Sequence, residues 1–376
     1  MRIAVNTRLL LKDKLEGIGW YTFETLSRIV KAHPNHDFYF IFDRAYSKEF
    51  VFAKNVHPIV LNPPTRHPIL WYIWFEWRLP KLLKQINADV FLSPDGFLSL
   101  KSKIPSLAVI HDINFKHYPK NLKFLHRLYY NYFFKKYAKK ASRIVTVSEY
   151  SKQDICDAYQ IDPSKIDLSL NGVNSNFHPI GLHEQIAIRN QYSESKDYFI
   201  FVGALHPRKN ILRLFLAFDA FKSETKSSNK LLIVGAKMWW NNDLKKGFDK
   251  LSHKEDIIFT GRKNQEELNQ LYASALALCY VPYFEGFGMP IIEAMKCACP
   301  VITANVSAMP EVAGDAALLV NPLEIREITQ AMTKLNTNSE LRAELSSRGQ
   351  MHSQHFNWNK TAAALWEGIE KVMHTC

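Results

Sequence analysis

The chain alternates short apolar runs with longer segments whose apolar residues recur at helical spacing. In the first half, the runs that predict strands are Ile3–Thr7, Phe38–Phe42, Val56–Val60, Val90–Leu92, Leu107–His111 and Arg143–Val147. The segments that predict helices there are Gly19–Lys31, Leu79–Ile86, Leu122–Ala141 and Lys152–Tyr159. Strands that alternate with helices favour a parallel, doubly wound sheet with helices on both faces.

The alternation fades over the polar residues 174–196 and resumes at Tyr198–Gly203. The later strand candidates are Lys230–Val234, Ile257–Thr260, Leu276–Tyr280, Val301–Ala304 and Ala317–Val320. The later helix candidates are Ile211–Lys222, Gln265–Ala273, Pro290–Met295, Leu323–Leu335, Ser339–Phe356 and Trp358–Val372. We interpret the polar stretch as a linker between two α/β domains.

A length of 376 residues also suits two domains. We place the first at residues 1–178, the second at 179–356, and a helix that crosses back to the first domain at 357–376. The chain opens directly on a strand pattern, without a leader, and no apolar run is long enough to span a bilayer. We therefore expect a cytoplasmic location, with a peripheral position on the inner membrane face as a hypothesis.

The positive charge is concentrated in the first half of the chain. The net charge is +12, and residues 1–180 hold 26 Lys and Arg against 15 Asp and Glu, a net +11 that leaves +1 for the remainder. An excess so one-sided favours a phosphate-rich partner: a nucleic acid, an anionic membrane or a lipid-linked phosphate. The alternative is a basic surface that only maintains solubility.

Neither the cysteines nor the carboxylates predict a metal site. The five cysteines are Cys156, Cys279, Cys297, Cys299 and Cys376. No cysteine or histidine pair stands at zinc-ligand spacing, so we expect buried, reduced thiols. No Asp-x-Asp pair that would chelate a diphosphate-bound Mg²⁺ or Mn²⁺ occurs in the sequence. We predict neither a metal nor a cofactor.

The strongest chemical signal is the segment Glu285-Gly-Phe-Gly-Met-Pro-Ile-Ile-Glu293, which follows an apolar run and opens a helix. Gly286 and Gly288 permit a tight turn and a close backbone approach, and the proline suits a first helical turn. The N–H groups at the start of a helix bind anions. Two carboxylates beside such a site, Glu285 and Glu293, indicate hydroxyl groups of a sugar or a ribose as ligands.

A second signal is the segment Phe201-Val-Gly-Ala-Leu-His-Pro-Arg-Lys-Asn210, which also joins a strand to a helix. Gly203 allows a sharp exit from the strand. Arg208 and Lys209 place two cations where a diphosphate would leave, and cations held there stabilise the leaving group as a metal does elsewhere. The alternative is an ordinary basic turn.

Two weaker signals lie in the first half. Glu16-Gly-Ile-Gly-Trp-Tyr21 is a glycine-rich turn between the first strand and the first helix, and its Gly17 and Gly19 suit phosphate or sugar contact. His111, followed by Asp112, ends a strand at the expected ligand edge and would hydrogen-bond a bound sugar. An ordinary turn and a structurally satisfied histidine are the alternatives.

In combination, these motifs resemble the GT-B glycosyltransferases of family four. Glu285–Glu293 is similar to the E-x7-E signature of that family, Phe201–Asn210 to its V-G-x-x-x-P-R-K-N loop, and Ser307–Val320 to a segment of its bacterial mannosyltransferase-like members. The remaining motifs follow in the order of the family: Gly17–Gly19, His111–Asp112, Val147–Glu149 and Asn171–Val173. The resemblance spans essentially the whole chain. The chain differs from the family in Asn6, where an aspartate is common, and in Glu16 and Trp20.

The resemblance implies a GT-B architecture, in which two Rossmann-like domains face a central cleft, and a retaining, metal-independent sugar transfer. It assigns catalytic roles to His111, Glu285, Arg208 and Lys209. It assigns donor binding to Gly17, Gly19, Gly203, Arg208, Lys209, Phe287, Gly288, Met289 and Glu293. Of these, Arg208 and Lys209 would bind the diphosphate, Glu293 the ribose hydroxyls, Glu285 the hydroxyls of the donor sugar, and His111 the transferred sugar. The nucleotide base would lie near Gly261–Glu266.

Two segments of the first half mix aromatic with basic residues, 66–84 and 116–140. Tryptophan and tyrosine suit a bilayer interface, and lysine suits anionic headgroups. We interpret these segments as a peripheral surface that reaches a lipid-linked acceptor. The alternative is that they form core helix faces with solvated lysines.

We therefore expect transfer of a hexose, with mannose from GDP-mannose favoured, onto a glycan or lipid-linked acceptor in bacterial surface polysaccharide synthesis. A donor of the UDP-sugar type is one alternative. A nucleic-acid-binding protein that uses the basic first half is another. We expect no nucleic acid partner, because the aromatic residues follow helical spacing rather than the alternation of a stacking sheet. A GT-B epimerase or phosphorylase and an inactive scaffold are further, weaker alternatives.

Overall fold

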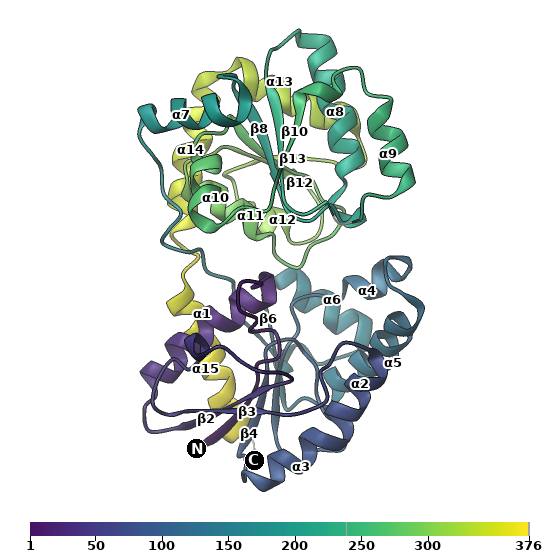
Figure 1. The fold of residues 1–376 in the computed structure, drawn as a ribbon, viewed down its shortest axis with the longest axis vertical. Coiled ribbons are helices and arrows are strands. Elements are labelled where there is room, and N and C mark those ends of the chain that lie inside the picture. Colours follow the sequence, from purple (N-terminus) through teal and green to yellow (C-terminus); the bar gives the residue numbers. More distant parts are fainter. Residues whose placement is uncertain (238, 375–376) are drawn as a thin grey trace. The chain divides into compact units, whose positions relative to one another are not determined.

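The computed structural model describes residues 1–237 and 239–374, so Cys376 lies outside the described residues. The chain forms two compact units (Figure 1). The first unit holds Met1–Gly172 and the C-terminal segment that begins at Trp358, and the second holds Val173–Asn357. The sequence pattern placed these divisions at 178 and 356.

The first unit is built on a seven-stranded parallel sheet with the order β3-β2-β1-β4-β5-β6-β7. Its strands are β1 (Arg2–Asn6), β2 (Asp37–Phe42), β3 (Val56–Val60), β4 (Val90–Ser93), β5 (Ser106–Val109), β6 (Arg143–Thr146) and β7 (Ile166–Leu168). The order reverses between β1 and β4, and the carboxyl ends of open parallel sheets bind ligands at such switch points.

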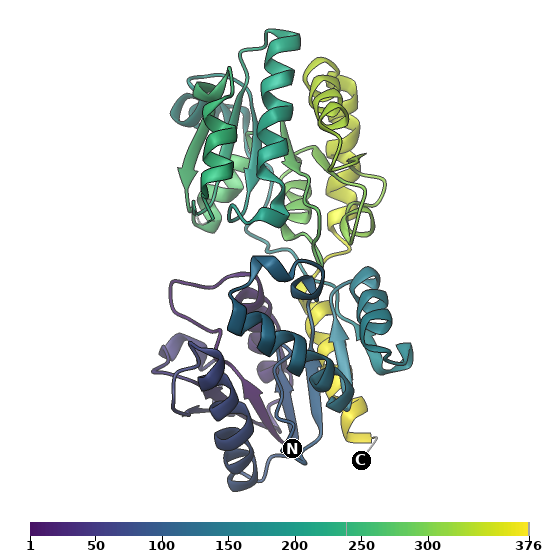
Figure 2. The same cartoon turned by 90° about the vertical axis from the view of Figure 1, so that its right-hand side faces the viewer.

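Helices cover both faces of this sheet (Figures 1 and 2). They are α1 (Gly17–Ala32), α2 (Pro68–Ile73), the π-helix Trp74–Arg78, α3 (Leu79–Gln85), α4 (Asn114–His117), α5 (Phe124–Lys140), α6 (Glu149–Tyr159) and α15 (Trp358–His374). One face packs strand residues such as Ala108 and Ile144 against Trp74 and Tyr137. On the other face, Gly368 of α15 lies against Leu107 and Val145.

The second unit has a six-stranded parallel sheet with the order β10-β9-β8-β11-β12-β13. Its strands are β8 (Tyr198–Val202), β9 (Lys230–Val234), β10 (Ile257–Gly261), β11 (Ala277–Tyr280), β12 (Val301–Ala304) and β13 (Leu318–Val320). Its helices are α7 (Leu182–Ser193), α8 (Ile211–Thr225), α9 (Asn242–Asp249), α10 (Gln265–Ala273), α11 (Met289–Lys296), α12 (Met309–Ala313), α13 (Ile325–Thr337) and α14 (Ser339–Ser353). Here the strand order reverses between β8 and β11.

Five single turns of 3-10 helix complete the secondary structure among the described residues. They are Lys48–Phe50, Pro119–Asn121, Pro163–Lys165, Pro207–Lys209 and Lys254–Asp256. The turn at Pro207–Lys209 carries two of the predicted site residues.

The two parallel α/β sheets confirm the predicted fold class, and the departures have local causes. The predicted linker 174–196 is wrong in part, because it contains α7. Only Ile188 and Ser193 of that helix are buried, so its sequence lacks the apolar stripe that reveals a helix. The pattern also missed the short elements β7, α2, α4 and α12. It missed α9 because all the described residues of that helix remain at least partly exposed.

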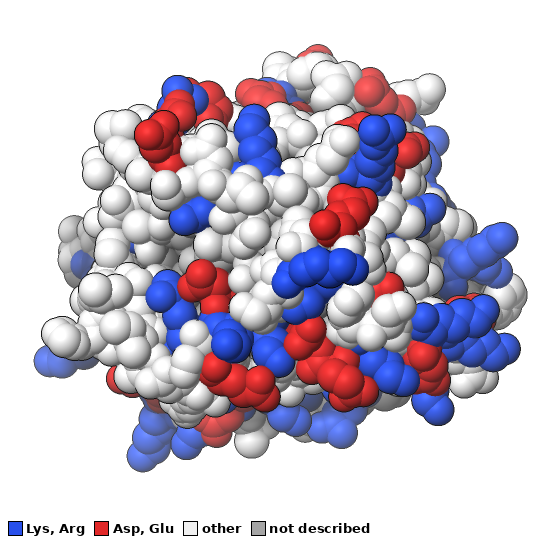
Figure 3. Space-filling view, turned by 90° about the horizontal axis from the view of Figure 1, so that it is seen from above, with Lys and Arg blue, Asp and Glu red and all other residues white. Residues whose placement is uncertain are grey.

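Charge is distributed unevenly over the molecule. On the face shown in Figure 3, Lys and Arg side chains are interspersed with Asp and Glu side chains. Residues 116–141, in contrast, hold eight Lys and Arg and no Asp or Glu. The basic excess of the first half is therefore concentrated around α5.

The close approach of two loops in the second unit generates a stability prediction. Gly235 has a φ of +142°, and a Cβ there would lie 2.2 Å from the carbonyl oxygen of Gly203. Gly261 also has a positive φ, +74°, but a Cβ there meets nothing within 4 Å. We expect Gly235→Ala to lower the free energy of unfolding by about 3 kcal/mol and Gly261→Ala by about 1 kcal/mol. Chemical denaturation measures both values, and equal losses would show that the close approach does not matter.

Candidate functional site

The two strongest motifs lie side by side at the switch point of the second sheet. The loop 203–210 follows β8, and the loop 281–288 follows β11, its neighbour in the sheet. The carboxyl ends of parallel strands share one edge, so both loops extend from the edge where open α/β sheets bind ligands. The structure thereby brings Arg208, Lys209 and Glu285 into contact.

A buried cluster of three charges forms the centre of this site. The Glu285 carboxylate, which is only 7% exposed, makes ion pairs with the Arg208 guanidinium and with the Lys209 ammonium group. Lys209 also donates to the Tyr280 hydroxyl group, and Arg208 Nη1 donates to the Phe284 carbonyl oxygen at 3.2 Å. The three side chains together carry one unit of positive charge, which favours an anion such as a diphosphate.

The protonation states in this cluster are set by its own charges. Burial raises the pKa of Glu285, but the nearby Lys209 and Arg208 outweigh burial and lower it to about 2. Burial, with Arg208 beside it, lowers the pKa of His206 to about 4. At neutral pH the carboxylate is therefore ionised and the imidazole is neutral. The Glu285 carboxylate therefore keeps its negative charge across the physiological range.

Local backbone features hold the two loops together. Asn210 has a φ of +62°, and its side-chain amide donates to the carbonyl oxygens of Val281, at 3.0 Å, and Pro322, at 2.7 Å. The backbone N–H of Tyr283 donates to the Arg208 carbonyl oxygen at 2.8 Å. The positions of both cations thus depend on direct hydrogen bonds between the β8 and β11 loops.

Glu293 lies in α11, beyond a glycine that no other residue can replace without strain. Gly288 precedes the helix with a φ of +100°, and a Cβ there would lie 2.7 Å from Met309 Cε. The hydroxyl group of Tyr272, a buried residue of α10, donates to Glu293 Oε2 at 3.0 Å. Burial raises the pKa of Glu293 to about 7, although the Tyr272 hydrogen bond acts in the opposite direction.

Three other predicted donor contacts occupy the same edge of the second sheet. Gly203 leaves β8 with a φ of +144°, and Met289 begins α11. The Phe287 ring packs edge-on against Phe356 with the centroids 5.7 Å apart, and the residue is buried, so its side chain has a packing role. The predicted base-binding region 261–266 spans the end of β10 and the start of α10.

His111 belongs to the first unit, two residues beyond the end of β5 rather than at the end of the strand as predicted. Its Nε2 lies 2.8 Å from the Pro94 carbonyl oxygen, which only accepts, so Nε2 carries a proton. The Tyr21 ring packs edge-on against the imidazole at 4.8 Å. Burial lowers the pKa of His111, which leaves a neutral ring whose Nδ1 is an acceptor.

The glycine-rich turn is not a loop as predicted. Helix α1 begins at Gly17, so both Gly17 and Gly19 lie in its first turn. A Cβ at Gly19 would lie 3.0 Å from the Leu9 carbonyl oxygen, whereas Gly17 has open space around it. Gly19 therefore has a packing reason to be glycine, and Gly17 presents a bare helix start to solvent.

A buried ion pair at the switch point of the first sheet was not predicted from the sequence. Arg8 Nε donates to Asp95 Oδ2 at 2.7 Å, and the guanidinium lies 4.1 Å from the centroid of the Phe97 ring. Asn6 Nδ2 donates to Asp95 Oδ1 at 2.8 Å. An aspartate at position 6 would place a second carboxylate against Asp95, whereas the Asn6 amide donates to it.

Other residues around the charge cluster of the second unit were also not predicted from the sequence. The Glu285 N–H donates to Ser307 Oγ at 3.3 Å, and Ser307 has a φ of +54°. Ser307 stands in a segment singled out by resemblance, so a signal existed for it. Tyr272 and Tyr280 lie outside every motif, and their contacts follow only from the packing of α10 and β11 around the site.

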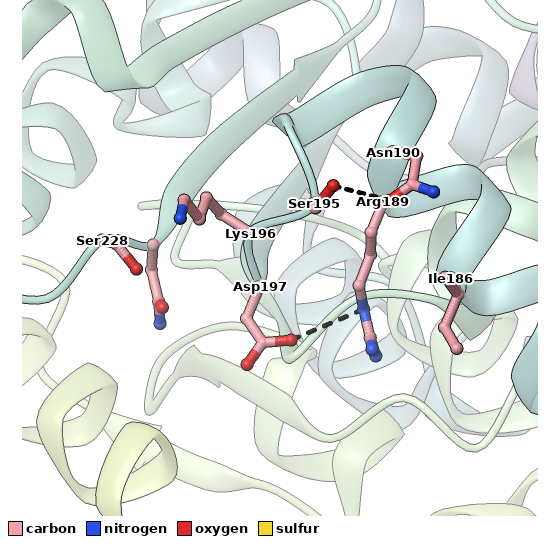
Figure 4. A pocket seen from close by; sticks show the side chains of 8 residues that line it. Ile186, Arg189, Asn190, Ser195, Lys196, Asp197 and Ser228 are labelled. Carbon is pink, nitrogen blue, oxygen red and sulfur yellow. Dashed lines mark hydrogen bonds and ion pairs between the residues drawn. The ribbon is translucent and has the colours of Figure 1, made fainter.

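A pocket in the second unit lies away from these residues (Figure 4). It is lined by Ile186, Arg189, Asn190, Ser195, Lys196, Asp197, Ser228 and Asn229. Arg189 Nε lies 3.5 Å from Asp197 Oδ1, and Asp197 immediately precedes β8. The pocket is thus at the amino ends of the strands, opposite to the edge that carries Arg208. Among the described residues, no three His, Cys, Asp or Glu side chains gather as metal ligands.

Two family models together span most of the chain. The model described as Glycosyltransferase Family 4 matches residues 15–177, and the model described as Glycosyl transferases group 1 matches residues 184–352. The second match includes every residue of the charge cluster. The first includes Gly17, Gly19 and His111.

Curated relatives and solved structures agree with these matches. The chain is 24% identical to O-antigen chain mannosyltransferase B of Escherichia coli, over 93% of this chain and 94% of that protein. It is 31% identical to O-antigen chain mannosyltransferase RfbU of Salmonella typhimurium, over 68% of this chain and 67% of that protein. Sucrose-phosphate synthase of Thermosynechococcus elongatus shares its fold with a TM-score of 0.77 at 16% identity, over 100% of both chains. The structure of the Anabaena protein HepE in complex with UDP-glucose has a TM-score of 0.75 at 17% identity, over 99% of this chain and 100% of that chain.

The raised pKa of Glu293 predicts pH-dependent binding of a nucleotide sugar. The resemblance assigns ribose hydroxyls to Glu293, and a hydroxyl donates to a carboxylate more strongly than to the protonated acid. Because the pKa in the free protein is about 7, we expect the affinity for the nucleotide sugar to fall as the pH drops below 7. Titration calorimetry with GDP-mannose and UDP-glucose, at pH values from 5.5 to 8.5 in steps of about half a pH unit, measures this dependence.

Two variants test the assignment of this pH dependence. Tyr272→Phe removes the hydrogen bond that lowers the pKa of Glu293, so the midpoint should move to higher pH. Glu293→Gln removes the titrating group, and any pH dependence that remains belongs to other groups of the protein or to the ligand. An unchanged profile in Glu293→Gln would exclude Glu293 as its source.

Proposed function

The chain belongs to the group 1, family 4 glycosyltransferases, and we propose that it transfers a hexose from a nucleotide sugar to a glycan or lipid-linked acceptor with retention of configuration. The observation that carries this proposal is the contact of Arg208, Lys209 and Glu285 at the switch point of the second sheet. Two cations held beside one carboxylate suit a ligand that joins a diphosphate to a polyol.

Each residue of the cluster, and also Glu293 and His111, has a distinct role in the proposed reaction. Arg208 and Lys209 bind the diphosphate, with the guanidinium donating directionally and the ammonium group acting as a point charge. Glu285 accepts hydrogen bonds from hydroxyls of the donor sugar, and its low pKa keeps it an acceptor. Glu293 accepts from the ribose. His111, neutral and protonated at Nε2, offers Nδ1 to a sugar hydroxyl.

The proposed reaction needs neither a metal ion nor a cofactor in addition to its two substrates. The acceptor hydroxyl oxygen bonds to the anomeric carbon on the face from which the diphosphate departs, as the bond between that carbon and the phosphate oxygen breaks. The proton of the acceptor passes to the leaving diphosphate. Negative charge therefore develops on the diphosphate, and Arg208 and Lys209 stabilise it where other enzymes use a metal ion.

Mannose from GDP-mannose is the donor that we favour. The support is the similarity to two O-antigen mannosyltransferases, one of which matches over 93% of this chain. The same relatives support a role for this transfer as a step in the synthesis of a bacterial surface polysaccharide. A UDP-sugar is the second candidate, because a structure of similar fold holds UDP-glucose.

The first test is the thermal stability of the protein with GDP, UDP or ADP, each with and without EDTA. We expect one diphosphate to raise the melting temperature, because a ligand that binds only the folded state stabilises it. The shift should survive EDTA. A shift abolished by EDTA would contradict metal-independent binding, and no shift with any diphosphate would contradict the donor site.

Substitutions in the donor site should lower turnover and leave the fold intact. We expect Lys209→Ala and Glu293→Ala each to reduce the rate of sugar transfer at least tenfold, a loss of about 1.4 kcal/mol or more in transition-state stabilisation. Lys245→Ala, which removes an exposed lysine of α9, is the matched control. Near-normal activity in well-folded Lys209→Ala or Glu293→Ala protein would refute the proposed donor site.

A further inference from the structure

Helix α5 is apolar on two faces, and only one of them is in the core. Tyr129, Phe134 and Tyr137 are buried in the first unit. On the outer side, Phe124, Leu125, Leu128 and Tyr132 are 45 to 66% exposed. Residues 124, 128 and 132 recur every four positions and so form one stripe along the helix. A surface helix needs a single apolar stripe to pack on its own protein, and this one has a second.

The neighbouring helical segment extends this stripe. In α2 and the π-helix that follows, Ile69, Tyr72 and Trp77 are exposed, at 61, 39 and 57%. The Tyr72 and Phe133 rings lie 6.1 Å apart, which places α2 beside α5 (Figure 1). We define the α2–α5 face by its seven exposed apolar residues: Ile69, Tyr72, Trp77, Phe124, Leu125, Leu128 and Tyr132.

This concentration of apolar side chains is unusual for the molecule. Among the residues that the structure describes, sixteen large apolar side chains are exposed, and seven of them belong to the α2–α5 face. The others are scattered over both units. Single exposed apolar residues need no explanation, but several gathered on neighbouring helices indicate a surface that contacts something apolar.

Cations surround the α2–α5 face without acidic neighbours on α5. Lys135, Lys136, Lys139 and Lys140 are exposed on that helix, which has no Asp or Glu. The Lys136 ammonium group lies 3.5 Å from the centroid of the Tyr132 ring, and that of Lys101 lies 5.3 Å from the Trp77 ring.

The acidic residue nearest to this face in α2 and the π-helix does not offset these charges at the surface. Glu76 is 3% exposed and accepts from the backbone N–H groups of Leu100 and Lys101. Its carboxylate is thus turned inward, where it fixes the loop that carries Lys101.

We propose that the α2–α5 face docks in the plane of an anionic lipid bilayer, with Phe124, Leu128 and Trp77 at the acyl boundary and the lysines at the headgroups. Exposed aromatic and leucine side chains beside lysines are the composition of interfacial helices. Among the described residues, no helix has the length and apolar character needed to cross a bilayer. This inference rests on the surface alone and not on the proposed donor or acceptor.

A bilayer fits this face better than other occupants do. A second copy of the chain, related by twofold symmetry, would enclose the four lysines of α5 in an interface to which α5 contributes no Asp or Glu. A nucleic acid would satisfy the lysines but would leave the protruding Phe124 and Leu128 against phosphates. An anionic bilayer accommodates both groups at once.

Vesicle flotation tests the proposal with the full chain. We expect the protein to float with vesicles of phosphatidylglycerol and phosphatidylcholine but not with phosphatidylcholine alone. Lys135→Gln/Lys136→Gln/Lys139→Gln should lower the partition coefficient roughly a hundredfold, since each lysine near an anionic surface contributes about fivefold. Phe124→Ser/Leu128→Ser should abolish flotation. Anionic vesicles should shift the tryptophan fluorescence of the wild-type protein to shorter wavelength, and Trp77→Phe should reduce that shift.

Matched variants on the second unit control for general effects of charge and apolarity. Lys245→Gln/Lys246→Gln/Lys250→Gln removes two exposed lysines of α9 and the exposed lysine that follows it, and Leu182→Ser/Leu323→Ser removes two exposed leucines. These variants should float like the wild type, and thermal melting should show all variants folded.

Three results would overturn the proposal. One is no flotation with anionic vesicles. Another is an equal loss in the control variants. The third is a dimer in sedimentation velocity that Phe124→Ser/Leu128→Ser dissociates in the absence of lipid binding, which would assign the face to a second copy.

Discussion

One carboxylate, that of Glu285, determines the geometry of the ligand edge of the second unit. It contacts both Arg208 and Lys209, and it belongs to a different loop from theirs. Without it, two neighbouring cations would stand half-buried and mutually repelling, and an uncompensated buried charge costs about 3–5 kcal/mol. The pairing therefore positions the cations in the absence of a ligand, so that the diphosphate of the proposed donor would meet an ordered site rather than two separate side chains.

The candidate site of the second unit was easier to predict than that of the first, because its residues lie close together in the sequence. Its decisive residues stand within two short segments, and each segment joins a strand to the next helix, so their meeting at one sheet edge follows from parallel topology. The roles of Tyr272 and Tyr280 did not follow, because their contacts depend on the packing of α10 and on a strand side chain whose orientation no motif records. Helix α7 was hidden for a related reason: a helix that buries little has no periodic signature.

The first unit was harder to predict because its polar contacts join distant parts of the chain. Asp95 meets Arg8 and Asn6 across more than eighty residues, and nothing local to either segment announces the pairing. The aromatic segments illustrate another limit. Their spacing is equally consistent with core and surface, and the structure assigns Trp74 and Tyr137 to the core but Trp77 and Tyr132 to the surface. Spacing predicts helices well, but which side of a helix faces inward depends on the neighbours.

The position of α15 has a consequence for how the chain matures. The first unit begins at Met1 but is completed only by the segment from Trp358, which packs on α1 and against Leu107 and Val145 of the sheet. The second unit is thus an insertion within the first. During synthesis, residues 173–357 are available to fold as a complete unit while the sheet of the first unit still lacks the helix that covers one of its faces. The domain that begins first is therefore finished last, and any interruption of translation before α15 leaves an apolar sheet face open to chaperones or proteases.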